Sequence, residues 1–226
     1  MLKAFLLGLA LCAGLRAQLL TRPSVQAAGS ATVSVPPDQA TLEVTVTTNG
    51  SSAQDAATKN ANQVSTLITA LTNLLGANAT ITTASYSVYP VYQSTVINTP
   101  ATITGYAANS IVQIVLSNLT QAGAAIDTSV ANGATSIGGI SFSLKNPEPQ
   151  REQALQMATQ QAMAHATSMA TASGHTVGAI RSLQEGSIIQ VSPIVGVAGT
   201  AASASTSVQP AQIQVQETVT LTADLN

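Results

Sequence analysis

The feature that most constrains the fold is a row of alanines between Asn146 and Gly174. They recur at every fourth position, as Ala154, Ala158, Ala162, Ala166 and Ala170. This spacing places them on one face of an α-helix. Asn146 suits an N-cap, the two prolines after it suit a first helical turn, and Gly174 is a typical C-terminal stop. The stretch therefore predicts a helix of about seven turns, with a smooth alanine face that packs closely on a sheet.

Alternating apolar and polar residues predict strands along much of the remaining chain. The expected strands lie at 30–35, 40–48, 79–91, 103–116, 136–145, 177–191 and 212–225. The first two are expected to be neighbours, joined by a turn at Pro36-Pro37-Asp38. Helical spacing predicts a second long helix over 51–75 and a shorter one over about 120–131. Together these elements predict an α+β fold, in which an antiparallel sheet is covered by two long helices and a shorter one.

The order strand, helix, strand, strand occurs twice, at an offset of about one hundred residues. This pattern indicates a pseudo-repeat with halves at about 30–117 and 134–226, inside a single domain spanning 28–226. The Ala-, Ser- and Gly-rich segment 192–210 is expected to be a long mobile loop.

The N-terminus has the pattern of a secretory signal peptide. Lys3 supplies a positive start, an apolar run follows, and Ala17 is the expected cleavage point. The apolar run is shorter than the roughly 20 residues of a membrane span. We therefore expect a signal peptide at 1–17, a flexible leader at 18–27, no transmembrane helix in the mature chain, and a periplasmic or secreted location.

The composition argues against some classes of partner and of covalent cross-link. Only 7% of residues are charged, against about 25% in an average soluble protein, so little charge repulsion opposes self-association. Five of the basic residues lie after the signal peptide and are scattered, which argues against nucleic acid as a partner. The one cysteine, Cys12, lies in the signal peptide, so we expect no disulfide in the mature protein.

Candidate catalytic groups are sparse. His165 and His175 lie about 15 Å apart if helical, too far to share a metal, so a structural or surface role is expected. Glu148 and Glu152 suit the helix dipole better than acid/base catalysis. The glycine pair at 138–139 predicts a β-bulge rather than a phosphate site. We therefore expect no enzyme, no metal and no cofactor.

All four tyrosines fall within a short stretch: Tyr86, Tyr89, Tyr92 and Tyr106. They lie on two predicted strands and the segment between them. One interpretation is a contact surface, because tyrosine serves interfaces well. The alternative is a partly buried core patch. We take the four tyrosines as the candidate interaction surface.

Several motifs resemble the SIMPL-domain family, which includes periplasmic immunogenic proteins and oxidative-stress defence proteins. They are GSATVSVPPDQATLEVTV near the start, Pro90-Val91-Tyr92, Ile103-Thr104-Gly105-Tyr106, ISFSL at 140–144 and the alanine-rich helix. The resemblance implies a secreted or periplasmic α+β protein that tends to form oligomers and has no established catalytic site. This chain has fewer charges than typical members, notably in the alanine-rich helix.

These observations lead to one main functional hypothesis and two alternatives. The first is an exported, non-enzymatic envelope protein that forms a homo-oligomer, with a link to envelope or oxidative-stress tolerance and an envelope-associated protein as a further partner. The second is a binding module for a small molecule or peptide, using the tyrosine strands and the 192–210 loop. The third, a hydrolase, would require dispersed catalytic groups to converge in space.

Overall fold

The computed structural model describes residues 22–93, 101–187 and 206–226. The strands are β1 (Ser24–Val35), β2 (Gln39–Gly50), β3 (Ala79–Gln93), β4 (Thr102–Leu116), β5 (Ser136–Ser143), β6 (Val177–Ser187) and β7 (Ile213–Leu225). The helices are α1 (Ala53–Leu75), α2 (Ala122–Ala131) and α3 (Glu148–Ala172), with 3-10 turns at Gly76–Asn78 and Leu119–Gln121. The α+β prediction is confirmed, and the expected helices and strands are present within the described ranges.

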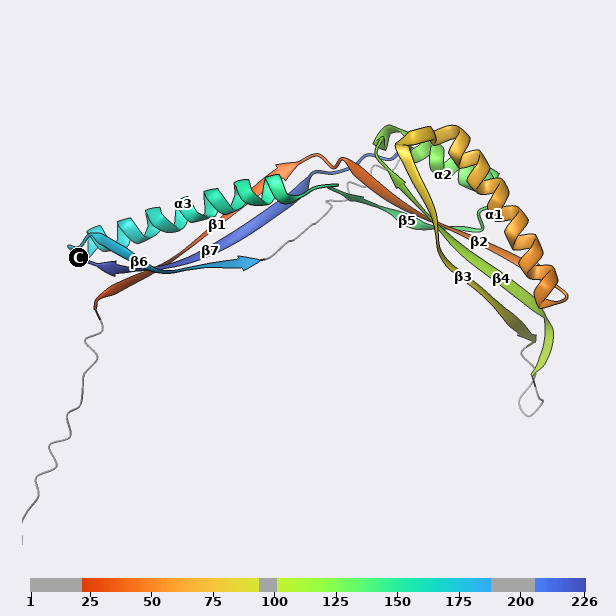
Figure 1. The fold of residues 1–226 in the computed structure, drawn as a ribbon, viewed down its shortest axis with the longest axis horizontal. Helices are drawn as coiled ribbons and strands as arrows, with labels where there is room; N and C mark the ends of the chain where they lie inside the picture. Colours follow the sequence, from red (N-terminus) through yellow and green to blue (C-terminus); the bar gives the residue numbers. More distant parts are fainter. Residues whose placement is uncertain (1–21, 94–100, 188–205) are drawn as a thin grey trace, which may run out of the picture.

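The strands form two antiparallel sheets rather than the one sheet expected (Figure 1). The first has the order β3-β4-β2-β5 and carries α1 and α2; we call it the four-strand lobe. The second has the order β1-β7-β6 and carries α3; we call it the three-strand lobe. Figure 1 shows the lobes end to end along the long axis of the molecule.

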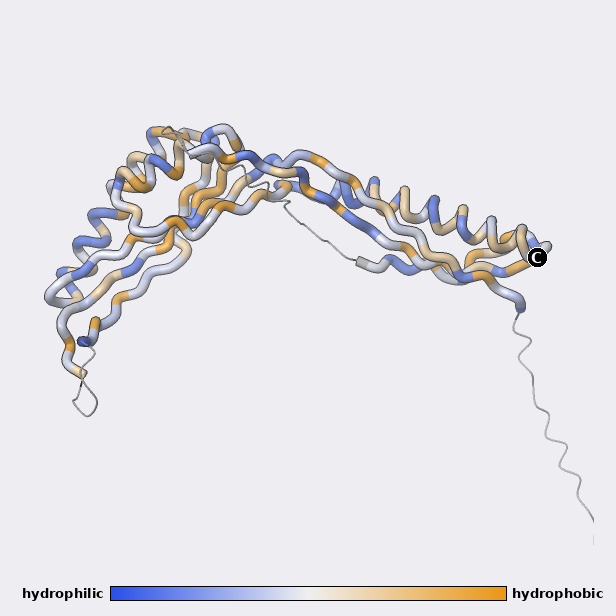
Figure 2. The backbone as a smooth tube through the Cα atoms, turned by 180° about the vertical axis from the view of Figure 1, so that it is seen from behind, coloured by the Kyte–Doolittle hydropathy of each residue, from blue (hydrophilic) through white to orange (hydrophobic). Residues whose placement is uncertain are grey.

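The core of the four-strand lobe lies between its sheet and α1. Alternate residues of β2 and β4 are buried there, and Leu67, Leu71 and Leu75 of α1 pack against them. Figure 2 shows the corresponding alternation of hydrophobic and hydrophilic positions along the strands. The helix begins where the hydroxyl of Ser52 accepts a hydrogen bond from the backbone N–H of Asp55, as an N-cap does.

The alanine helix lies on the three-strand lobe as predicted. All five alanines of its row are buried, and α3 packs on β1 and β7. Gly29 of β1 lies directly under the helix: a Cβ there would stand 2.1 Å from the carbonyl oxygen of Ala158 and 2.5 Å from the nitrogen of Ala162. Small residues on both elements therefore bring the two backbones into close contact.

Side chains of α3 also cover the outer edge of β1. The backbone N–H of Ser30 donates to Oε1 of Gln161 at 2.6 Å. Nδ1 of His165 lies 2.8 Å from the carbonyl oxygen of Ala28. Two backbone groups on this strand edge are thus paired with side chains of the helix, and His165 makes a structural contact, one of the two roles expected for it.

Two expectations about the N-terminal part are wrong. Residues 24–27, assigned to the flexible leader, belong to β1 and pair with β7. β1 is not a neighbour of β2, because the two strands lie in different sheets. Pro36 and Pro37 explain the difference: they fix the backbone in an extended form and lack N–H donors, which suits a crossing from one sheet to the other better than a hairpin.

A helix followed by an antiparallel hairpin occurs in both lobes, as α1-β3-β4 and as α3-β6-β7. The strands that precede the two helices pair differently. β2, before α1, pairs with β4 of its own lobe. β5, before α3, does not join the sheet of α3 but pairs with β2, and the position beside β7 is occupied by β1. The two lobes therefore exchange strands across their junction.

Besides β1, three strands lie at sheet edges in the described part of the chain, and each is interrupted by a register shift. These are β3, β5 and β6. In β5 the shift falls at Gly138 and Gly139, where Gly139 has a φ of 119°, so the predicted bulge is confirmed. Bulges at edges hinder unplanned pairing with other strands, but in β6 both shifts precede Ser182, so the strand from Ser182 to Ser187 keeps a regular edge.

Candidate interaction surface

The tyrosines of β3 are exposed to solvent. Tyr86, Tyr89 and Tyr92 keep 53%, 46% and 56% of their surface accessible, while Tyr106 of β4 is half-buried. Val91 and Ile103 are exposed beside them, and Ile103 pairs with Tyr92 across the two strands. We call Tyr86, Tyr89, Val91, Tyr92 and Ile103 the tyrosine surface. All four candidate tyrosines thus lie on one hairpin, three of them exposed on β3 and the fourth half-buried on β4.

The tyrosine surface occupies both faces of β3. Successive side chains of a strand point to opposite faces, so Tyr86 and Tyr92 lie on one face, and Tyr89 and Val91 on the other. The hairpin of β3 and β4 projects at one end of the molecule, past the start of α1 (Figure 1). It is therefore accessible from two sides.

The hairpin belongs to a long segment without charged residues. No Asp, Glu, Lys, Arg or His occurs between Lys59 and Asp127, a stretch that contains most of α1 and the whole of β3 and β4. This uncharged segment can be read directly from the sequence.

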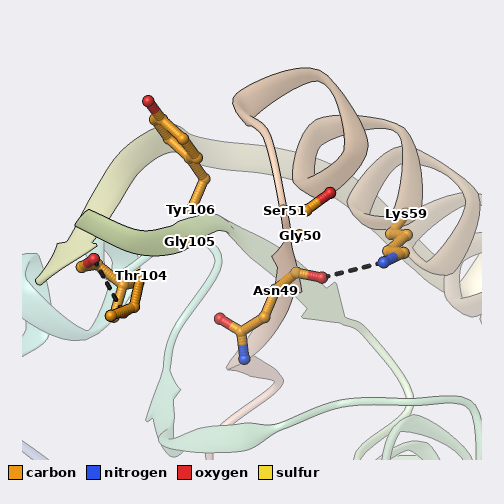
Figure 3. A pocket seen from close by; sticks show the side chains of 8 residues that line it. Asn49, Gly50, Ser51, Lys59, Thr104, Gly105 and Tyr106 are labelled. Carbon is orange, nitrogen blue, oxygen red and sulfur yellow. Dashed lines mark hydrogen bonds between the residues drawn. The ribbon is translucent and has the colours of Figure 1, made fainter. Parts of the chain in front are cut away.

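A shallow hollow of about 450 Å³ lies beside the connecting end of this hairpin, where Val91, Thr104 and Gly105 line it. Figure 3 shows its walls, which include Asn49, Lys59, Thr104 and Tyr106. The ammonium group of Lys59 is already engaged, because it donates to Oδ2 of Asp55 at 2.9 Å and to the carbonyl oxygen of Asn49 at 3.4 Å. The hydrogen bond from Lys59 and, next, one from the Ser51 backbone lower the pKa of Asp55.

A second group of exposed apolar side chains lies on β6. Ile180 and Leu183 are more than half exposed on this edge strand. We did not single them out from the sequence, because VGAIRSLQEGS has no regular alternation. The cause is visible in the structure: β6 has two register shifts, on either side of Ile180.

Polar groups buried in each lobe serve the fold. In the four-strand lobe, Nδ2 of Asn60 donates to the carbonyl oxygens of Val46 and Ala108, and its Oδ1 accepts from the Ser110 hydroxyl. These bonds join α1 to β2 and β4. A fully buried polar group with its partners in place gives the packing a single register.

In the three-strand lobe, the fully buried Glu217 of β7 faces Arg151 of α3. Nε of Arg151 donates to Oε1 of Glu217 at 2.9 Å, and its Nη2 donates to Glu185 of β6. These hydrogen bonds, the one to Glu217 first, raise the pKa of Arg151. One guanidinium group thus links a helix to two strands.

The other side chains that could bind a metal or take part in catalysis lie apart from one another. Within the described residues, no three His, Cys, Asp or Glu side chains come together in a way that could hold a metal ion. His175 contacts the carbonyl oxygen of Ser173 through Nδ1, and Glu148 lies 3.8 Å from Arg151. In the same ranges, no helix has both the length and the hydropathy needed to cross a bilayer. The signal peptide at 1–17 and most of the 192–210 loop lie outside the described residues.

The fold and its exposed hairpin define a class: an α+β protein made of two antiparallel sheets, each with one face under helices. The chain belongs to the SIMPL family, described as a protein of unknown function (DUF541), whose model matches residues 25–223. It is also similar to the 26 kDa periplasmic immunogenic protein of Brucella melitensis. That match has 24% identity over 173 residues and covers 74% of this chain and 69% of the relative. The resemblance inferred from the motifs is therefore confirmed.

Proposed function

We propose that this chain is an exported, non-enzymatic protein of the bacterial cell envelope that acts in the periplasm and assembles with copies of itself. The periplasmic location is supported by the name of the Brucella relative and by the signal-peptide pattern of residues 1–17. The family resemblance adds a link to envelope or oxidative-stress tolerance as part of the same proposal.

The free edge of β6 is the observation that carries the self-assembly part. From Ser182 to Ser187 the strand pairs regularly with β7 on one side, and no described strand lies on its other side. Leu183 is exposed within this regular stretch. An open strand edge with an apolar side chain is a template for pairing with another chain. With little charge on the protein, little repulsion opposes such pairing.

Size-exclusion chromatography with light scattering tests this proposal on the chain from Gln18 onward. We expect a mass above that of one chain, increasing with protein concentration until the assembly is complete. Leu183→Lys places a charge on the open edge and should weaken association about tenfold or more, since burial of a leucine contributes about 1.5–3 kcal/mol.

Val130→Lys is the matched control, because Val130 is equally apolar and exposed but lies on α2. It should leave the association constant unchanged. A monomer at every concentration would contradict self-assembly, and equal effects of the two substitutions would contradict the role of β6.

A further inference from the structure

We propose that the end of the β3 and β4 hairpin is a lipid-contact site, through which the tyrosine surface enters the interfacial layer of a membrane. The site is distinct from the β6 edge, which lies in the other lobe. The partner is the headgroup and upper acyl region of a phospholipid bilayer, bound without a requirement for anionic lipid.

The side-chain chemistry matches that environment. Tyrosine collects at membrane interfaces because its ring is apolar and its hydroxyl can remain hydrated. The aliphatic residues Val91 and Ile103 are exposed among the tyrosines. No charged residue lies on either strand of the hairpin. Lys59, which shares the hollow with Val91, is paired with Asp55, so contact through the hairpin itself removes no charge from water.

The arrangement favours a lipid surface over a second copy of the chain. Side chains on both faces of the hairpin are exposed, and a bilayer can surround both faces, whereas a docked protein surface covers one. The edge of β3 is also poorly suited to strand pairing. Register shifts interrupt its ladder near Ala84 and between Val91 and Tyr92, and Pro90 has no N–H group.

Intrinsic fluorescence gives a selective test with the unlabelled chain. The protein has no tryptophan, and its four tyrosines all lie on β3 and β4, so the emission reports on this hairpin alone. We expect phosphatidylcholine vesicles with brominated acyl chains to quench the emission saturably, while unbrominated vesicles do not. Quenching should be the same when phosphatidylglycerol is included and when salt is raised, because no charged group takes part.

The variant Tyr92→Ser with Ile103→Ser removes a cross-strand pair from the tyrosine surface and retains three tyrosines as reporters. We expect vesicle partitioning to fall at least tenfold, which corresponds to about 1.4 kcal/mol. Val130→Ser with Met169→Ser is the matched control, with two exposed apolar residues on α2 and α3, outside both the hairpin and the β6 edge, and should partition as the unchanged protein does. Circular dichroism checks that both variants fold.

Three results would overturn the proposal. The first is absence of quenching and of co-sedimentation with either vesicle, a measurement that needs no variant. The second is binding that requires phosphatidylglycerol and disappears in salt. The third is a change in oligomer mass caused by Tyr92→Ser with Ile103→Ser without lipid, which would identify the hairpin as an interface between copies. Failure of the β6 edge to associate would leave this proposal unaffected.

Discussion

At the scale of single residues, the close packing of α3 on its sheet depends on a side chain that is absent. Gly29 faces α3 so closely that a methyl group would overlap backbone atoms of Ala158 and Ala162. Those atoms belong to a regular helix and cannot move aside as a flexible side chain would. The alanine row and Gly29 therefore act together, since each allows the close approach only if the other is small.

Gly29→Ala is expected to destabilise the protein by about 3 kcal/mol, the upper part of the range for overpacking. Urea unfolding followed by circular dichroism measures this change. Ala28→Ser, at an exposed position next to it in β1, serves as control and should shift the free energy of unfolding by less than about 0.5 kcal/mol. Similar stability of Gly29→Ala and the unchanged protein would show that α3 can move away from β1.

Residue-level expectations differed in how well the sequence supported them. The alanine face and the bulge at Gly138 and Gly139 were predictable, because each depends on local spacing or on backbone freedom. The partner of Gly29 was not predictable, because it lies about 130 positions further along the chain. The exposure of the tyrosines was not predictable either, because alternation shows which side chains share a face but not whether that face is covered.

At the scale of elements, the link between α3 and its sheet depends on one buried charge. Glu217 has no exposed surface, and Arg151 is its ion-pair partner. Removing one member of a buried pair leaves the other without compensation, whereas replacing both with apolar residues is often neutral. The pair is therefore expected to act as a unit.

Arg151→Met should lower the urea midpoint clearly, and Arg151→Met combined with Glu217→Leu should recover most of the loss. Lys59→Met is the control, because its pair with Asp55 is exposed on both sides and surface pairs contribute little. If the double variant were less stable than Arg151→Met alone, the charge of Glu217 would not be the source of the effect.

Element positions followed from the sequence because capping and periodicity are local signals. The helix over 51–75 was predicted nearly to the residue, since Ser52 supplies the cap and apolar spacing defines the rest. Strand partners were harder. Nothing in SATVSV indicates that it pairs with residues near the other end of the chain, so the expected hairpin with β2 was wrong.

At the scale of the whole molecule, the two lobes have unequal cores. The four-strand lobe buries leucines, isoleucine and valines between its sheet and α1. Most of the buried cluster in the three-strand lobe consists of alanine: Ala27, Ala158, Ala162, Ala166 and Ala223, with Val25, Val219 and Leu221. Each additional buried CH₂ group contributes about 0.8 kcal/mol. The four-strand lobe should therefore resist opening more strongly.

Native-state hydrogen exchange tests this difference. We expect amide protons of β2 and β4 to exchange at least tenfold more slowly than those of β1 and β7, after correction for intrinsic rates. The same protection in both lobes would show instead that they open together as one cooperative unit.

The pairing of β1 with β7 also determines the order in which the two lobes can fold. Ser24 lies opposite Asp224, so β1 is separated from its sheet partner by about 200 positions of chain. The four-strand lobe, by contrast, draws its strands and helices from the interval 39–143. When the chain emerges from its N-terminal side, that lobe can close while β1 remains unpaired ahead of it, and the three-strand lobe forms only after β7 has emerged. An interruption before β7 would thus leave a half-folded protein with β1 unpaired.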